Sequence, residues 1–246
     1  MNRAKTKNSR TPSDKYWIIV PAAGLGRRMG AEIAKQYLRI GTKTILELTL
    51  DRLSQLDKIE KIILVLHPDD SSWKFLNHDQ YKNVVTVVGD DERWKSVLNG
   101  LLYLQTLAND RDWVLVHDAV RPCVTVSDMK KLMATLSLDP VGGLLAAPVR
   151  ETIKQSDAND IVIDTPDRNR LWLAGTPQMF RYGILMQAVT RVLENGSSVT
   201  DEASAVEAMG REVHLVKGRN DNIKVTHPED LLLIEAVLAL GQDLRS

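Results

Sequence analysis

Residues 16–26, Tyr-Trp-Ile-Ile-Val-Pro-Ala-Ala-Gly-Leu-Gly, pass from a continuously apolar run into a glycine-rich turn. Most of the later apolar runs are also continuous rather than alternating, which is typical of strands that are covered on both faces of a sheet. The stretch therefore predicts a buried first strand that ends in a loop. Further strands are expected at residues 61–66, 84–89, 113–117, 143–149 and 213–217.

Segments with helical character lie between these runs. Thr44 and Glu47 form a capping box at the start of one helix, and Thr226 and Glu229 repeat that motif before a last helix at 231–240. Strands that alternate with helices predict a largely parallel sheet with helices on both faces. We therefore expect a three-layer, Rossmann-like α/β fold with a mostly parallel central sheet. Further helices are expected at residues 92–108, 127–138, 181–195 and 200–210.

Residues 149–177 interrupt this alternation. They contain two short β-like pieces around the turn-forming string Ser156-Asp-Ala-Asn-Asp160, which predicts a hairpin arm. An isolated hairpin is only marginally stable in water. We therefore expect the arm to pack against another protein surface, and a second subunit is the favoured candidate.

The composition is that of an ordinary globular chain. It has 246 residues, 43% of them hydrophobic, and 32 Lys and Arg balance 32 Asp and Glu. This length suits one large domain with a substantial core. The lone Cys123 excludes an internal disulfide and a zinc cage of several cysteines. No apolar run approaches the ~18 residues of a membrane helix, and neutrality disfavours nucleic acid as a partner.

The net charge of zero hides an uneven distribution, because residues 1–43 carry ten basic and only two acidic side chains. Half of this excess lies in residues 1–15, a polar stretch that we expect to be a disordered basic tail before one domain at 16–246. The stretch resembles a short transit peptide in composition. It lacks the apolar core of a secretory signal, and we expect a cytoplasmic protein.

The other half of the excess surrounds the glycine-rich loop. Gly24 and Gly26 let the backbone approach a phosphate with free N–H groups, and Arg27, Arg28 and Lys35 follow closely. The chain has no Walker A motif, and the dinucleotide fingerprint lacks its third glycine. Glycines alone are equally consistent with a tight strand-to-helix turn. Glycines and cations together favour a triphosphate site.

A series of short blocks along the sequence resembles a known family. The loop Pro21-Ala-Ala-Gly-x-Gly-x-Arg-Met29 resembles the signature of sugar-phosphate nucleotidyltransferases, and Lys35-Gln-Tyr-Leu38 is similar to their 2-C-methyl-D-erythritol 4-phosphate cytidylyltransferase branch, of the non-mevalonate isoprenoid pathway. The resemblance spans roughly residues 17–230 and implies the nucleotidyltransferase fold with a protruding β-hairpin arm. The later blocks are Gly89-x-x-x-Arg93-x-x-Ser96-Val97, His117-Asp-Ala-x-Arg-Pro122, Thr176-Pro-Gln178, Thr200-Asp-Glu-Ala203 and Asn222-Ile-Lys224.

The resemblance also implies roles for these residues. Arg28 and Lys35 would stabilise the pentavalent transition state at the α-phosphate of CTP. Arg168 and Lys224 would hold 2-C-methyl-D-erythritol 4-phosphate and aim its phosphate oxygen. In the family's exchanged-arm homodimer, Arg168 would reach the neighbour's site. The nucleotide side would further include Ala22, Ala23, Gly24, Gly26, Gly89, Asp91, Ser96 and Asp118, and the acceptor side Thr152, Thr176 and Thr200.

Asp118 follows an apolar run at the predicted carboxyl edge of the sheet, where open α/β sheets bind ligands. A carboxylate there can help to hold the Mg²⁺ that bridges triphosphate oxygens, and we favour this role over a helix cap or an ion pair with Arg121. His117 has no histidine at ligand spacing, so we expect it to be structural and expect no zinc. For Ser96, contact with the nucleotide and capping of a helix stay equally open.

The chain departs from the family pattern at three positions. Asp90 replaces the second of two glycines that are usual in the family, which leaves open whether its backbone contacts the nucleotide. Val120 and Ala34 also differ from the usual residues. Neither change removes a functional group, so we interpret both as packing variation.

The expected reaction is a direct in-line transfer. The acceptor phosphate is already ionised at neutral pH, so it needs no general base to attack the α-phosphorus of CTP. One alternative is a cytidylyltransferase for another polyol phosphate, such as ribitol 5-phosphate. Another is a non-catalytic nucleotide-binding regulator that kept the fold, against which Arg28, Lys35 and Asp118 argue.

Overall fold

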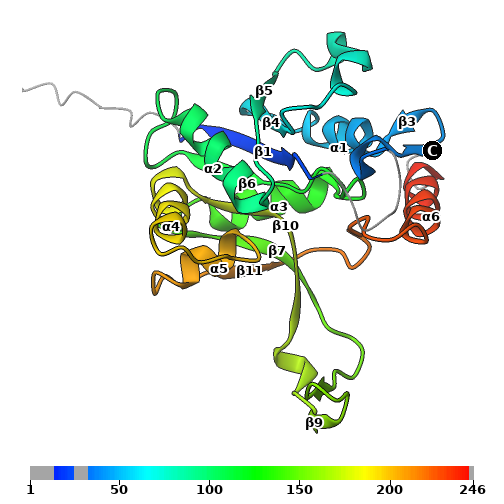
Figure 1. The fold of residues 1–246 in the computed structure, drawn as a ribbon, viewed down its shortest axis with the longest axis vertical. Helices are drawn as coiled ribbons and strands as arrows, with labels where there is room; N and C mark the ends of the chain where they lie inside the picture. Colours follow the sequence, from blue (N-terminus) through cyan, green and yellow to red (C-terminus); the bar gives the residue numbers. More distant parts are fainter. Residues whose placement is uncertain (1–13, 25–32, 244–246) are drawn as a thin grey trace, which may run out of the picture.

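A seven-stranded sheet in the order β11-β7-β10-β6-β1-β4-β5 forms the centre of the molecule. The structure, a computed structural model, describes residues 14–24 and 33–243 (Figure 1). Every strand runs in the same direction except β10, so the predicted mostly parallel α/β sheet is confirmed. The strands are β1 (Tyr16–Ala22), β4 (Ile59–Leu66), β5 (Val84–Val88), β6 (Trp113–Val116), β7 (Gly142–Pro148), β10 (Trp172–Arg181) and β11 (His214–Lys217).

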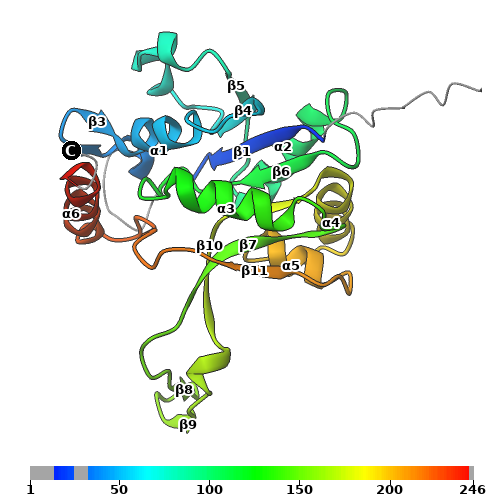
Figure 2. The same cartoon turned by 180° about the vertical axis from the view of Figure 1, so that it is seen from behind.

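Helices cover both faces of the sheet, which gives the three predicted layers. Figure 1 shows α2, α4 and α5 over one face, and Figure 2 shows α3 over the other. Alternate residues of β1 enter different cores: Trp17 and Ile19 pack with α2 and α4, whereas Ile18 and Val20 pack with α1 and α3. This two-sided burial explains the continuously apolar strands. The helices are α1 (Ile45–Leu53), α2 (Arg93–Leu104), α3 (Val126–Leu136), α4 (Tyr182–Glu194), α5 (Glu202–Glu207) and α6 (Asp230–Asp243).

Strand β10 is the main difference from the sequence-based expectation, which gave the arm residues up to 177. Residues 172–174 instead pair with β7, and the rest of the strand continues between β7 and β6. The antiparallel direction follows from the connection, because a chain that leaves β7 through a hairpin returns beside it in the opposite sense. The projecting segment is therefore 149–171.

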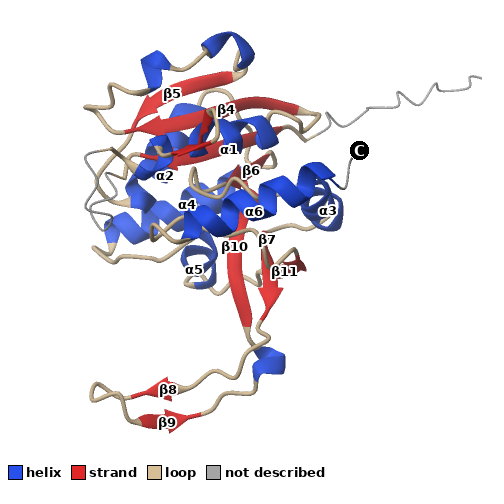
Figure 3. Cartoon of the chain, turned by 90° about the vertical axis from the view of Figure 1, so that its right-hand side faces the viewer, coloured by secondary structure: helices blue, strands red, loops and turns tan. Residues whose placement is uncertain are grey.

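This projecting arm carries the predicted hairpin at its tip. Strands β8 (Gln155–Ser156) and β9 (Val162–Asp164) pair antiparallel, and Figure 3 shows the arm extending away from the body. Asp157 Oδ1 accepts the backbone N–H groups of Asn159 and Ile161, which is a turn stabilised by its own side chain. Close to the body, the arm contains the short helix η5 (Arg168–Arg170).

Two caps set the ends of helices near the site. The capping box predicted at Thr44 and Glu47 is present. The carboxylate that closes the second cap is Asp230, the first residue of α6, rather than the predicted Glu229. Its Oδ2 accepts the backbone N–H groups of Thr226 (2.7 Å) and His227 (2.8 Å).

The remaining elements are short. None of the helices in the described part of the chain has the length and apolar character of a membrane span. The predicted tail at 1–15 lies almost wholly outside the described residues. The short elements are η2 (Lys35–Tyr37), β2 (Arg39–Ile40), β3 (Lys43–Thr44), η3 (Trp73–Phe75) and η4 (His78–Gln80).

Candidate active site

A cleft of about 440 Å³ opens at the carboxyl ends of the parallel strands. From β1 the chain continues through β4 and β5 on one side and then crosses to β6 on the other, so the order of strands reverses between β1 and β6. Open α/β sheets bind ligands at such switch points. Residues on both sides of the reversal line the cleft: Pro21, Ala22, Ala23, Gly24, Lys35, Gln36, Asp90, Asp91, Arg93, Ser96, Asp118, Ala119, Val120, Lys224 and Thr226.

Lys35 is presented to the cleft by a firmly anchored turn. The next residue, Gln36, is buried and donates its side-chain N–H to the carbonyl oxygen of Ala22 at 2.8 Å. Tyr37 is also buried, and its hydroxyl lies 2.8 and 2.9 Å from the carboxylate oxygens of Asp70. These contacts join η2 to the ends of β1 and β4, so the base of the Lys35 side chain is held in place.

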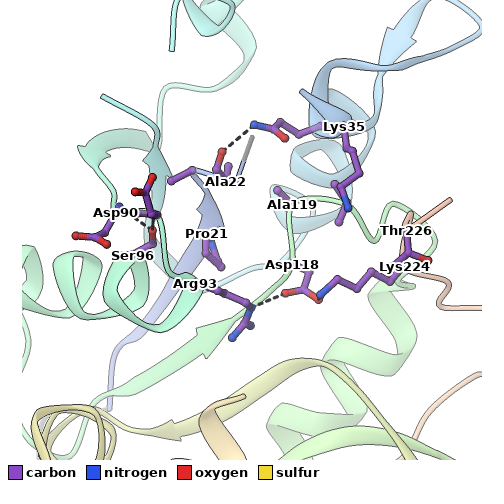
Figure 4. A pocket seen from close by; sticks show the side chains of 15 residues that line it. Pro21, Ala22, Lys35, Asp90, Arg93, Ser96, Asp118, Ala119, Lys224 and Thr226 are labelled. Atoms are coloured by element: carbon purple, nitrogen blue, oxygen red, sulfur yellow. Dashed lines mark hydrogen bonds and ion pairs between the residues drawn. The ribbon is translucent and has the colours of Figure 1, made fainter. Parts of the chain in front are cut away.

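Asp118 is the centre of a cluster of cations. Its Oδ1 accepts from Arg93 Nε at 3.0 Å, and its Oδ2 lies 3.2 Å from Arg121 Nε and 3.0 Å from Lys224 Nζ. Arg93 and Lys224 approach the carboxylate from opposite sides of the cleft (Figure 4). Arg121 also donates through Nη1 to the carbonyl oxygen of Asn222 at 2.7 Å. The ion pair with Arg121 that the sequence left open is therefore present.

The charges around Asp118 determine its protonation. Burial alone would raise the pKa of this carboxyl, but Arg93, Lys224 and Arg121 outweigh burial and hold the pKa well below its usual range. Burial likewise opposes the charge of Arg93, whose pKa Glu202 and Asp118 nevertheless raise. At neutral pH Asp118 is therefore ionised and Arg93 is protonated.

His117 is fully buried behind Asp118 and does not line the cleft. Burial lowers the pKa of His117 to about 4, so the ring is neutral. Its Nε2 faces the carbonyl oxygen of Arg121 at 3.2 Å, and a carbonyl only accepts. We therefore assign the proton to Nε2, which makes Nδ1 the acceptor of the Thr176 hydroxyl at 3.0 Å. That hydroxyl oxygen accepts the backbone N–H of Asp118, so the predicted structural histidine orients the segment that carries the carboxylate.

The turn after β5 forms another wall of the cleft. Ser96 is buried, its hydroxyl oxygen accepts the backbone N–H of Asp90, and its hydroxyl donates to the carbonyl oxygen of the same residue, both at 3.0 Å. A side chain at Gly89 would place its Cβ 2.6 Å from Ala23 Cβ, so only glycine fits there. The Asp90 side chain is partly exposed, 3.9 Å from Lys95. Ser96 thus holds the turn around a residue that departs from the family pattern.

Two charged residues beside the cleft, the partly buried Arg93 and the buried Glu202, received no role from the sequence. Glu202 is 2% exposed, and its oxygens accept from Arg93 Nη1 at 2.6 Å and Nη2 at 3.1 Å. Both residues stand inside the blocks quoted above, where Arg93 follows Gly89 by four residues and Glu202 follows Thr200 by two. Their places in these blocks were the signal that the sequence offered. No local pattern, however, indicates an ion pair between two residues that lie 109 positions apart.

The predicted residues fall into four groups. Ala22, Ala23, Gly24, Lys35, Asp91, Ser96, Asp118 and Lys224 line one cleft, with Gly89 and Thr176 packed behind it. Thr200 is exposed just before α5. Thr152 and Arg168 lie on the arm, where Arg168 Nη1 donates to the carbonyl oxygen of Arg150, and they do not line this chain's cleft. Gly26, Arg27 and Arg28 lie outside the described residues.

The cleft offers limited ligands for a cation. Among residues 14–24 and 33–243, no three His, Cys, Asp or Glu side chains gather as a metal site. A carboxylate has about four acceptor positions, and three cations occupy three of those on Asp118. The remaining position on Oδ1 suits Mg²⁺, which commonly takes one carboxylate and completes its shell with phosphate oxygens and water.

Comparisons with known proteins agree on one family. A family model described as IspD, 2-C-methyl-D-erythritol 4-phosphate cytidylyltransferase, matches residues 16–240. The chain is 47% identical over 224 residues to the cytidylyltransferase of that name from Hahella chejuensis, covering 91% of this chain and 93% of the relative. It is 49% identical over 228 residues to the one from Shewanella sediminis, covering 93% and 95%. The crystal structure of the Francisella tularensis protein of that name matches with a TM-score of 0.78 at 34% identity, covering 91% of this chain and 100% of that chain.

Proposed function

The chain belongs to the 2-C-methyl-D-erythritol 4-phosphate cytidylyltransferase family, and from that premise we propose how its cleft performs the family's reaction. The protein transfers the cytidylyl group of CTP to 2-C-methyl-D-erythritol 4-phosphate in the non-mevalonate isoprenoid pathway. The products are 4-diphosphocytidyl-2-C-methyl-D-erythritol and pyrophosphate. The observation that supports the assignment of roles is the convergence of Lys35, Asp118 and Lys224 on one cleft.

On the nucleotide side, the backbone of Ala22, Ala23 and Gly24 would bind CTP at the end of β1. Lys35 would neutralise charge that develops on the α-phosphate and the departing pyrophosphate, where a preorganised cation stabilises the transition state. Arg28, outside the described residues, is assigned the same task. Gly89 and Ser96 support this side by keeping the turn at Asp90 in its shape.

On the acceptor side, Lys224 would bind the phosphate of 2-C-methyl-D-erythritol 4-phosphate and aim one of its oxygens at the α-phosphorus. A new P–O bond forms as the bond to pyrophosphate breaks. The attacking phosphate is already ionised, and the buried His117 is neutral and away from the cleft, so no side chain acts as a general base. Thr176 would keep Asp118 oriented, and Thr200 would add a hydroxyl contact.

Asp118 would hold Mg²⁺ through its remaining acceptor position. When bound, the ion would screen the triphosphate charge and stabilise the leaving pyrophosphate. The three cations around Asp118 keep the carboxylate ionised for that purpose.

A homodimer would explain the arm. Three successive apolar residues at its tip, Ile161, Val162 and Ile163, are each more than half exposed, and a hairpin alone is only marginally stable. Arg168 and Thr152 share that arm and do not line their own chain's cleft. We propose that they reach the cleft of a second copy.

The reaction is tested by pyrophosphate release from CTP with 2-C-methyl-D-erythritol 4-phosphate or ribitol 5-phosphate as acceptor. We expect turnover with the first acceptor, loss of that turnover when Mg²⁺ is omitted, and recovery when it is restored. Preference for ribitol 5-phosphate would overturn the acceptor assignment. Full activity after exhaustive chelation would overturn the metal assignment.

The shared site is tested by mixing two inactive variants, Lys35→Ala and Arg168→Ala. In a mixed dimer, one cleft combines an intact Lys35 with an intact Arg168 from the other chain. Random exchange of subunits should therefore restore about a quarter of the wild-type activity. If the mixture stays as inactive as its components although mixed dimers form, Arg168 does not act across the interface.

A further inference from the structure

Among the residues that the structure describes, Glu202 is the one buried carboxylate beside the cleft to which the proposed reaction gives no task. It is the first residue of α5 and is 2% exposed. A carboxylate so deeply buried is costly unless it is paired. Both of its oxygens accept from Arg93, at 2.6 and 3.1 Å, which is the bidentate geometry that fixes two side chains most firmly.

Arg93 passes this constraint on to the reaction centre. It is the first residue of α2, directly after the turn that lines the nucleotide side, and its third donor, Nε, binds Asp118 Oδ1 at 3.0 Å. A guanidinium is rigid and planar, so fixing two of its nitrogens on Glu202 fixes the direction of the third. The orientation of the Asp118 carboxylate therefore depends on Glu202.

The charge balance argues that Arg93 positions rather than binds substrate anions. One guanidinium is shared by two carboxylates, Glu202 and Asp118, so its positive charge is already more than compensated. Lys35 also lines the cleft, where the proposed function assigns it to the phosphates of CTP.

Glu202 also sits at the start of the helix that follows Thr200. The preceding Asp201 caps α5 and accepts from Gln178 Nε2 at 2.8 Å, while Gln178 Oε1 accepts the backbone N–H of Ala203 at 2.8 Å. The end of α5 is thus tied to β10 by Gln178 and to α2 by Glu202. Loss of either tie would loosen the segment that carries Thr200.

We propose that Glu202 is a positioning residue of the transfer reaction. Through Arg93 it aims the Asp118 carboxylate, and through α5 it holds Thr200 on the acceptor side. This inference rests on the proposed function, because it assigns a reaction to the cleft that Glu202 organises.

The first test is Glu202→Gln, which keeps the shape of the side chain and removes its charge. By comparison with outer-shell residues of other sites, we expect kcat to fall about 10- to 100-fold, with a higher KM for the acceptor and little change in the KM for CTP. The matched control is Asp14→Asn, which removes the carboxylate of another ion pair of 2.6 Å, with Arg181, away from the cleft. It should leave kcat unchanged.

A double variant separates positioning from stability. Replacing a buried ion pair by apolar residues is often neutral or stabilising, so Arg93→Met combined with Glu202→Leu should restore the melting temperature but not kcat. Wild-type turnover by a folded Glu202→Gln or by the double variant would overturn the proposal.

A spectroscopic readout keeps this inference separate from the proposed function. The Nε–H of Arg93 should give a slowly exchanging ¹⁵N NMR signal that is lost in Glu202→Gln and kept in Asp14→Asn, with Arg93→Lys as the assignment control. Wild-type protein without turnover would refute the proposed function. Persistence of that signal in Glu202→Gln would refute the positioning role, whatever the activity.

Discussion

Acidification should destabilise this protein through one buried histidine. His117 is fully buried, and its pKa falls from an ordinary 6.5 to about 4. In the unfolded chain the ring takes up a proton as the pH falls below 6.5, whereas the folded protein resists protonation until about pH 4. The unfolded state therefore binds more protons in this window, and the free energy of unfolding must fall as the pH falls.

The size of the effect follows from the two pKa values. Between pH 7.5 and pH 5.0, His117 should lower the free energy of unfolding by about 2 kcal/mol. The loss approaches about 3 kcal/mol near pH 4. Single domains are stable by only about 5–15 kcal/mol. The cause is structural: a charged ring would put a second proton on Nδ1, facing the Thr176 hydroxyl that now donates to it.

Urea denaturation at pH 7.5 and pH 5.0 measures this difference. Wild type should lose about 2 kcal/mol more than His117→Asn, because the pH dependence of the variant's free energy of unfolding lacks this histidine whatever its absolute stability. The control His227→Gln changes an exposed histidine and should keep the wild-type slope. Equal losses in wild type and His117→Asn would show that His117 titrates alike in both states, and the reasoning would be wrong.

Three further predictions concern the cleft and the arm. Lys35→Ala should lower kcat, measured as pyrophosphate release, on the order of 10²- to 10³-fold, whereas Lys82→Ala, at an exposed lysine, should leave kcat unchanged. A change in kcat of only a few-fold in Lys35→Ala would show that Lys35 does not take part in the chemistry. Gly89→Ala forces a Cβ to 2.6 Å from Ala23 Cβ and 2.9 Å from Ser96 Oγ, so the melting temperature should drop, consistent with about 1–3 kcal/mol of overpacking, and the KM for CTP should rise; unchanged values would mean that the turn relaxes freely. Ile163→Asp places a charge on the exposed apolar tip of the arm and should shift sedimentation toward monomer, unlike Leu138→Asp, which alters the 94% exposed Leu138 away from the arm; a stable Ile163→Asp dimer would exclude the tip from the interface.

The sequence predicted the parts of the fold whose signal is local. Strands such as β1 and β4 are buried on both faces, and a short continuously apolar run records that directly. Strand β10 has no such local signal, because its first four residues are partly or fully exposed and its buried part, from Thr176 on, begins with the Thr176–Pro177 step. Its place in the sheet depends on pairing with β7 and β6, which no pattern within ten residues encodes.

The same distinction holds for the cleft. Residues beside the glycine turn, such as Gly24 and Lys35, could be predicted because cations and glycines lie close together in the chain. The charges around Asp118 come from positions 93, 121 and 224, each unremarkable in its own neighbourhood. Arg121 is near Asp118 in the sequence, but only the fold brings Arg93 and Lys224 to that carboxylate, because strand ends that are distant in sequence share one edge of the sheet.

This difference explains how a chain of zero net charge can bind small anions. The basic excess of residues 16–43 is visible in the sequence because few acidic residues oppose it locally. On the other side of the cleft, Arg93, Arg121 and Lys224 surround Asp118, and Glu202 opposes them further, so three cations and two carboxylates leave a single positive charge. Such a cluster attracts anions only weakly. Its side chains are nevertheless well ordered, because each ion pair fixes their orientation. Its contribution to the reaction should therefore appear in kcat, through orientation, more than in the affinity for CTP.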